Sequence, residues 1–185
     1  MEILLLILVV IIVFPLIYLI LQYNGFVSLR NQIAEAWSNI DTELKRRYEL
    51  IPNLVNTVKG YATHEREVLE HVVQLRNSCM ANTGSPAEQI EGENQLTGAL
   101  KQLLAVAENY PNLKADASYL QLQNELVNTE DRIQAARRFY NGNVRDYRVK
   151  FESFPTNLIA STFHFAPEEF LTIDSVVREV PEVKF

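Results

Sequence analysis

Hydrophobic residues fill positions 3–21 without a polar interruption. Seventeen of these nineteen residues are Leu, Ile, Val or Phe, and the other two are Pro15 and Tyr18. At about 1.5 Å of rise per residue, such a helix reaches roughly 28 Å, close to the thickness of the hydrocarbon core of a bilayer. Residues 1–23 are therefore predicted to form a transmembrane anchor in the lipid bilayer, with Tyr18, Tyr23 and Arg30 at the interface on the exit side.

A cleaved signal peptide is the competing interpretation of this run. It would have a basic start, a shorter apolar core and a small-residue cleavage site. The chain starts Met1-Glu2, and the run is followed by QYNGF at residues 22–26, so we expect an uncleaved, single-pass anchor. Arg30 and the basic segment 45–47 follow the run, while only Glu2 precedes it. The positive-inside rule then places the N-terminus outside and the C-terminal domain in the cytoplasm.

Beyond the anchor, apolar residues recur at steps of three or four, which is the period of one helical face. The first such stripe runs through Ile33, Trp37, Ile40, Leu44, Tyr48, Ile51, Val55, Val58, Ala62, Leu69 and Val72. The stripe keeps its phase across Pro52. We therefore expect one long helix with a kink at Pro52, which can continue directly from the anchor.

Turn residues then divide the chain. The segment 82–86 (NTGSP) predicts a turn, after which Ser85 caps a second helix that has Pro86 at its first position and Glu88 in its first turn. This helix ends before Pro111. Its stripe consists of Ile90, Leu96, Leu100, Leu103, Leu104 and Ala107. A third long helix is predicted from Leu113 to about Lys150.

These elements predict an all-α fold, in which an N-terminal transmembrane helix precedes an antiparallel bundle of long helices. The bundle domain covers residues 24–153 and contains three helices, or four if Pro52 divides the first. Residues 154–185 change character, because FPTN at 154–157 breaks the helix and the following residues alternate weakly. We expect this Phe-rich segment to be an extended tail that packs on the bundle.

Composition excludes several classes of function. The net charge is −6 and the isoelectric point is near 5.1, which argues against nucleic acid as a partner. The single cysteine, Cys79, rules out an intramolecular disulfide and a cysteine-built metal site. It follows Val72 and Leu75 at helical spacing, so we expect a buried small hydrophobic residue rather than a reactive thiol.

The histidines do not form a metal or catalytic motif. His64-Glu65 begins like a zinc-protease motif, but Val68 stands where the second histidine is required, and His71 lies seven residues after His64. We expect both histidines at the surface. His164, between two phenylalanines, is interpreted as a packed or capping residue. No catalytic residue, cofactor or metal site is predicted.

Polar residues within the apolar stripes are the remaining candidates. Glu130 and Arg137 lie seven residues apart on one face, and we expect them, with Trp37, to fix helix register or to contact another subunit. The pairs at 46–47 (RR) and 137–138 (RR) could contact lipid phosphates, although paired charges on a helix are usually only solvated.

Several motifs resemble the LemA family of bacterial membrane proteins in order and spacing. They are YN (23–24), LRN (29–31), AWSNID (36–41), LKRR (44–47), LIPNLV (50–55), VKGYA (58–62), HE (64–65), NTEDRI (128–133), ARR (136–138), YN (140–141), VRDY (144–147), FPTN (154–157), IA (159–160) and PEVKF (181–185). The resemblance implies an N-terminal transmembrane helix with a short external N-terminus and a helical domain behind it. It thereby implies the bacterial inner membrane, and it transfers no catalytic residues.

Two classes of function follow. The first is a non-enzymatic scaffold that forms a homo-oligomer through its long amphipathic helices, or binds a membrane or cytoplasmic protein, and organises or shapes the membrane. The second is a membrane-anchored binding module or enzyme with a polar pocket around Glu130, Arg137 and Trp37. Substituting Glu130 or Arg137 should disturb folding or assembly in the first case. If the chain is a binding module or enzyme, the same substitution should leave folding and assembly unchanged and abolish ligand binding.

Overall fold

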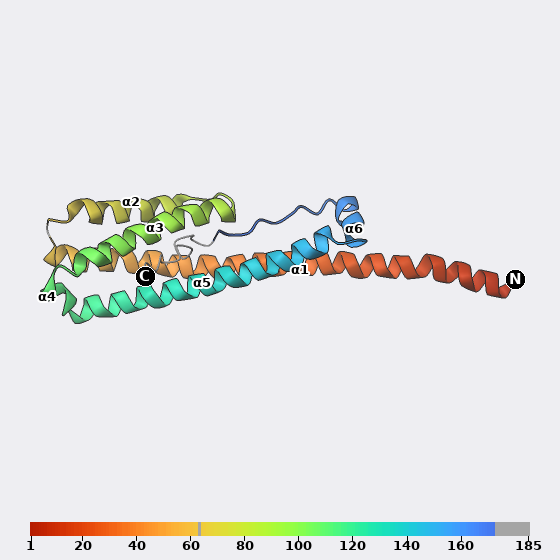
Figure 1. Cartoon of the computed structure of the whole chain (residues 1–185), viewed down its shortest axis with the longest axis horizontal. Coiled ribbons are helices and arrows are strands. Elements are labelled where there is room, and N and C mark those ends of the chain that lie inside the picture. The colour runs from red at the N-terminus through yellow and green to blue at the C-terminus, as the bar shows by residue number, and fades with distance from the viewer. Residues whose placement is uncertain (63, 173–185) are drawn as a thin grey trace, which may run out of the picture. The chain divides into compact units, whose positions relative to one another are not determined.

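The computed structural model describes residues 1–62 and 64–172, and these residues are mostly helical (Figure 1). The helices are α1 (Glu2–Tyr61), α2 (Arg66–Ala81), α3 (Pro86–Ala107), α4 (Pro111–Lys114), α5 (Ala117–Glu152) and α6 (Thr156–Thr162). No strand occurs in the two described ranges. The predicted all-α class is confirmed.

The chain divides into two compact units, and helices α1 and α5 contribute residues to both. The span unit consists of residues 1–36 and 139–170. The bundle unit consists, among the described residues, of 37–138 and 171–172.

The bundle unit buries the apolar stripes that the sequence predicts. The second half of α1, together with α2, α3 and the first half of α5, supplies its core. The fully or almost fully buried side chains include Ile40, Leu44, Ile51, Leu54, Val58, Val72, Ile90, Leu96, Leu103 and Ile133. Burying such side chains is the main favourable contribution to folding, and each adds about 1.5–3 kcal/mol relative to an exposed position.

The predicted end of the first helix is wrong. Instead of continuing to Val72, α1 ends at Tyr61, and α2 begins at Arg66. Gly60 lowers helix propensity just before the break. The period of the stripe gave no sign of this break, because Val58 at the end of α1 and Leu69 in α2 are both buried in the same core.

Pro52 does not interrupt α1, and the structure shows how its missing amide is compensated. In an α-helix the amide of residue 52 would bond to the carbonyl of Tyr48, and proline has no N–H to donate. The Nε of Arg76, on α2, donates instead to that carbonyl at 2.8 Å. A side chain of the neighbouring helix thus satisfies the backbone acceptor that Pro52 leaves open.

Because Arg76 replaces the amide that Pro52 lacks, the effects of substitutions at positions 52 and 76 on the free energy of unfolding should be coupled. Arg76→Met should lower the free energy of unfolding by about 1.5–3 kcal/mol, the range for a hydrogen bond from a charged donor. In a Pro52→Ala background the helix amide can bond to Tyr48, so the same substitution should cost much less. Chemical unfolding of the four variants measures the coupling. Equal costs in both backgrounds would show that Arg76 does not replace the lost amide.

The start of α3 confirms the predicted cap. The Ser85 hydroxyl accepts a hydrogen bond from the Glu88 amide, and the Glu88 carboxylate accepts one from the Ser85 amide. This capping box satisfies two amides that the helix cannot pair internally, while Pro86 occupies a position that needs no donor.

In the span unit, the first part of α1 is long and apolar enough to cross a membrane, with a mean hydropathy of 3.5 over 18 residues and none of them buried. The segment after α5 differs from the predicted extended tail. Residues Thr156–Thr162 form α6, and only from Phe163 onward is the described chain without regular structure. The PEVKF ending and the rest of 173–185 lie outside the described residues.

A backbone cap closes α6. His164 has φ of 55° and its amide bonds to the Ser161 carbonyl, while the Phe165 amide bonds to the Ala160 carbonyl. These paired bonds, with a left-handed residue between them, are the Schellman motif. A capping role for His164 is thus confirmed, and its side chain is exposed.

Candidate functional site

A buried arginine at the centre of the bundle unit joins three helices. Arg47, on α1, is only 1% exposed. Its Nη2 donates to the Glu93 carboxylate of α3, and its Nη1 lies 2.9 Å from both Thr97 Oγ1 of α3 and Glu130 Oε2 of α5. The Tyr48 hydroxyl donates to the second oxygen of Glu93. We call Arg47, Tyr48, Glu93, Thr97 and Glu130 the Arg47 network.

The apolar stripes place the members of this network inside the bundle. Arg47 stands between Leu44 and Ile51 on the buried face of α1, and its side chain is almost entirely covered by protein. Glu93 likewise stands between Ile90 and Leu96 in the stripe of α3. A buried charge requires a hydrogen-bonded partner of opposite sign. The two buried charges, Arg47 on α1 and Glu93 on α3, therefore stabilise each other.

The tyrosine and the cysteine beside Glu93 are held in their neutral forms. Burial, followed by the hydrogen bond to Glu93, raises the pKa of Tyr48 far above its ordinary value. Burial also raises the pKa of the nearby Cys79 thiol to about 12, with the charge of Glu93 adding to the effect. Both groups are neutral at physiological pH. The buried cysteine expected from the sequence is confirmed, and the network contains no activated nucleophile.

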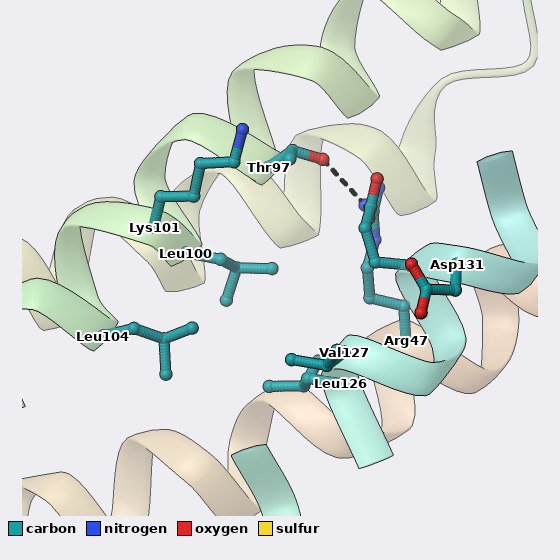
Figure 2. Close-up of a pocket in the computed structure, with 9 residues that line it drawn as sticks. Arg47, Thr97, Leu100, Lys101, Leu104, Leu126, Val127 and Asp131 are labelled. Carbon is teal, nitrogen blue, oxygen red and sulfur yellow. Dashed lines mark hydrogen bonds and ion pairs between the residues drawn. The ribbon is translucent and has the colours of Figure 1, made fainter. Parts of the chain in front are cut away.

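An open pocket of about 180 Å³ lies beside the network (Figure 2). In Figure 2, Leu100 and Leu104 of α3 point toward Leu126 and Val127 of α5 across the pocket. Its polar lining comes from Arg47, Thr97, Lys101, Glu130 and Asp131. This arrangement suits a small, mainly apolar molecule. Within residues 1–62 and 64–172, no three His, Cys, Asp or Glu side chains are grouped so that they could hold a metal ion.

The residues proposed from the sequence occupy separate places in the bundle unit. Glu130 bonds to Arg47 and accepts from Gln134 at 2.9 Å. Arg137 is buried and donates to Asn94 Oδ1 at 3.2 Å and to the Thr172 carbonyl. Trp37 is half-buried. The pocket beside Glu130 is lined without Arg137 or Trp37.

Three members of the network were not identified correctly from the sequence. Arg47 was paired with Arg46 as a solvated or lipid-facing charge, and this is wrong for Arg47, although Arg46 is exposed. The sequence pattern singled out neither Glu93 nor Thr97. For Glu93 the available signal was the gap between Ile90 and Leu96, where a charged residue occupies a position that the helical period assigns to the core. Arg47 left no such gap, because Tyr48 keeps the stripe of α1 in step.

The residues predicted for the membrane interface lie in the span unit. The Tyr23 ring packs against Phe163 and Phe165, at centroid distances of 5.0 and 5.6 Å. The guanidinium of Arg30 lies over the Phe165 ring at 5.9 Å. Tyr18 is partly exposed within α1. Aromatic and cationic side chains therefore gather where the apolar run ends.

Comparison with known proteins identifies the family. The LemA family profile matches residues 36–185. Protein LemA of Metamycoplasma hominis is 30% identical over 137 residues, which cover 74% of this chain and 63% of that protein. Magnetosome protein MamQ 2 of Paramagnetospirillum magneticum is 28% identical over 177 residues, covering 82% of this chain and 65% of that protein. The chain thus spans slightly less than two thirds of the length of these curated relatives. Because the profile covers most of its length, the chain belongs to the LemA family.

Proposed function

We propose that this chain is a non-enzymatic, membrane-anchored scaffold that self-associates through its long amphipathic helices and organises or shapes the membrane. The observation that carries the proposal is the continuity of α1. One helix, Glu2–Tyr61, contains both the apolar run and the first helix of the bundle, and no loop separates them. In this proposal the shared helix couples the bundle to the bilayer.

The chemistry of the Arg47 network supports a structural role. The Arg47 guanidinium donates to the carboxylates of Glu93 and Glu130. The Tyr48 hydroxyl donates to Glu93. Groups that bond to one another across three helices fix the register of those helices. Arg137 adds a second tie between α5 and α3 through Asn94. We assign register roles to Glu130 and Arg137, and a contact between subunits to Trp37.

Helix α5 offers a surface for self-association. Leu120 and Val127 are 42% and 50% exposed, and their spacing of seven residues places them on one face of the helix. Exposed apolar residues on a long helix favour pairing with a second helix of the same kind. We place the chain in the bacterial inner membrane as a single-pass protein. Its N-terminus would lie outside and its bundle in the cytoplasm, since the basic residues follow the apolar run.

Cross-linking of full-length protein in membranes tests this surface. Val127→Cys in a Cys79→Ser background should give dimers and larger species with a short bismaleimide. His71→Cys, at an exposed position of α2, is the matched control and should give few. Absence of cross-links at Val127, or equal cross-linking at both positions, would contradict self-association through α5.

The pocket beside Glu130 supports a second candidate, a binding module for a small apolar ligand. In that case Leu104→Trp, which fills the pocket, should abolish ligand binding while the protein still folds and assembles. Under the scaffold proposal the same variant leaves assembly unchanged and no bound small molecule is found by native mass spectrometry.

A further inference from the structure

The corner between α5 and α6 is free of charged residues. From Ser153 to Pro167 there is no Asp, Glu, Lys or Arg, although charged residues make up 22% of the whole chain. His164 is the one titratable side chain in this segment. The polar residues of this corner are uncharged, so any large apolar patch exposed here is informative.

Three large apolar side chains of this corner point outward. Phe154 is 80% exposed, Leu158 is 57% exposed and Phe163 is 43% exposed. The inner side of α6 is formed by Ile159 and Ala160, which are buried. The corner therefore presents apolar side chains on both sides of α6, one toward the protein and one away from it.

The corner lies close to the end of the apolar run. The Phe163 ring packs on Tyr23 at 5.0 Å, and Tyr23 follows Leu21, the last residue of the apolar run, by two residues. Two residues of helix correspond to about 3 Å of rise. Phe163 therefore lies at the level where α1 leaves the apolar run, and this level is the membrane surface if that run spans the bilayer.

Cations lie next to the same level. The Lys150 ammonium is 5.0 Å from the centre of the Phe26 ring, and the Arg30 guanidinium is over Phe165. Acidic residues flank the corner at both ends: Glu152 is paired with Arg148 at 3.5 Å, and Glu168 and Glu169 follow Pro167. Aromatic side chains together with Lys and Arg are typical of the headgroup region, where the rings bury in the interface and the cations meet lipid phosphates.

We propose that the α5–α6 corner is a second membrane contact, in which Phe154, Leu158 and Phe163 insert into the interfacial layer of the bilayer that α1 crosses. The occupant of this apolar surface is lipid. The corner sets the tilt and depth of α1 by holding the chain at the interface at a second point. This inference rests on the anchor in the proposed function, and goes beyond it by assigning a membrane role to α6.

Site-specific fluorescence tests the contact in full-length protein reconstituted into vesicles of phosphatidylcholine and phosphatidylglycerol. An environment-sensitive nitrobenzoxadiazole label is attached at Leu158→Cys in a Cys79→Ser background. Ile12→Cys within the apolar run is the anchor control, and His71→Cys is the aqueous control. Phe154→Cys repeats the test at a site whose side chain is 80% exposed, so that folding is undisturbed.

The expected result is that labels at 158 and 154 emit at shorter wavelength than the label at 71. They should also be quenched by lipids carrying a nitroxide near the headgroup, and be several-fold less accessible to aqueous iodide. A label at 158 that is open to iodide, while the label at 12 is quenched by lipid, overturns the contact and leaves the anchor intact. Protection from both quenchers also overturns it, since protein would then cover the corner. Iodide access at 12 would refute the anchor and, with it, this inference.

Discussion

Replacing Glu93 with alanine is expected to lower the free energy of unfolding by about 3–5 kcal/mol, because it leaves the buried guanidinium of Arg47 without its main partner. Glu93 is 3% exposed and accepts from both Arg47 and Tyr48. Arg47 would keep Glu130 and Thr97, which lie on one side of the guanidinium only. Denaturant unfolding in mild detergent, followed by circular dichroism, measures the loss.

Two control variants separate a lost ion pair from a general disturbance of the core. Glu130→Ala should lower the free energy of unfolding clearly less than Glu93→Ala does. The Glu130 side chain is 29% exposed, and its removal leaves the Arg47–Glu93 pair intact. The double variant Arg47→Met with Glu93→Leu should recover most of the stability lost in Glu93→Ala, since apolar residues of similar volume remove both buried charges. A Glu93→Ala protein within 1 kcal/mol of the wild type would contradict the role given to the network.

Placing two arginines in the centre of the apolar run should remove the protein from the membrane. Each change from Ile to Arg costs about 3–4 kcal/mol of insertion free energy, so Ile11→Arg with Ile12→Arg costs about 6–8 kcal/mol. This is comparable to the whole favourable contribution of the seventeen aliphatic and Phe residues. The double variant should appear in the soluble or aggregated fraction, whereas the wild type stays in membranes after carbonate extraction.

The control for this experiment adds the same charge elsewhere. Asn124→Arg with Asn128→Arg introduces two arginines at exposed positions of α5. That variant should remain in the membrane fraction like the wild type. Retention of the Ile11→Arg, Ile12→Arg protein in carbonate-washed membranes would contradict the anchor.

The sequence predicts the helices well where local signals and burial agree. Ser85, Pro86 and Glu88 mark the start of α3, and all three act there as the pattern indicates. The end of α1 was missed because a chain reversal leaves no trace in the period when both helices bury the same face. Pro52, the stronger local signal for a break, is accommodated because Arg76 supplies the missing hydrogen bond from 24 residues away.

The candidate site was harder to predict than the fold. A charged residue in an apolar stripe shows that the position faces inward, but it does not name the partner. Arg47 bonds to Glu93 and Glu130, which are 46 and 83 residues away in sequence, so only tertiary structure brings them together. The sequence predicts a role for Glu130 in helix register or subunit contact, because it lies seven residues from Arg137 on one face. In the structure Glu130 bonds to Arg47.

The Arg47 network and the α5–α6 corner would have complementary roles in a membrane scaffold. The network joins α1, α3 and α5 through the bonds of Arg47, and in this account it would hold them in one register. The corner would hold α1 at a defined depth. In this account both features would serve positioning.

The mass of the full-length protein in mild detergent tests the central claim most directly. Size-exclusion chromatography with multi-angle light scattering, corrected for bound detergent, gives the protein mass in one experiment. The scaffold account predicts a defined assembly whose protein mass is a fixed multiple of the 21.2 kDa chain. A single species of one chain, unchanged across concentration, would contradict it.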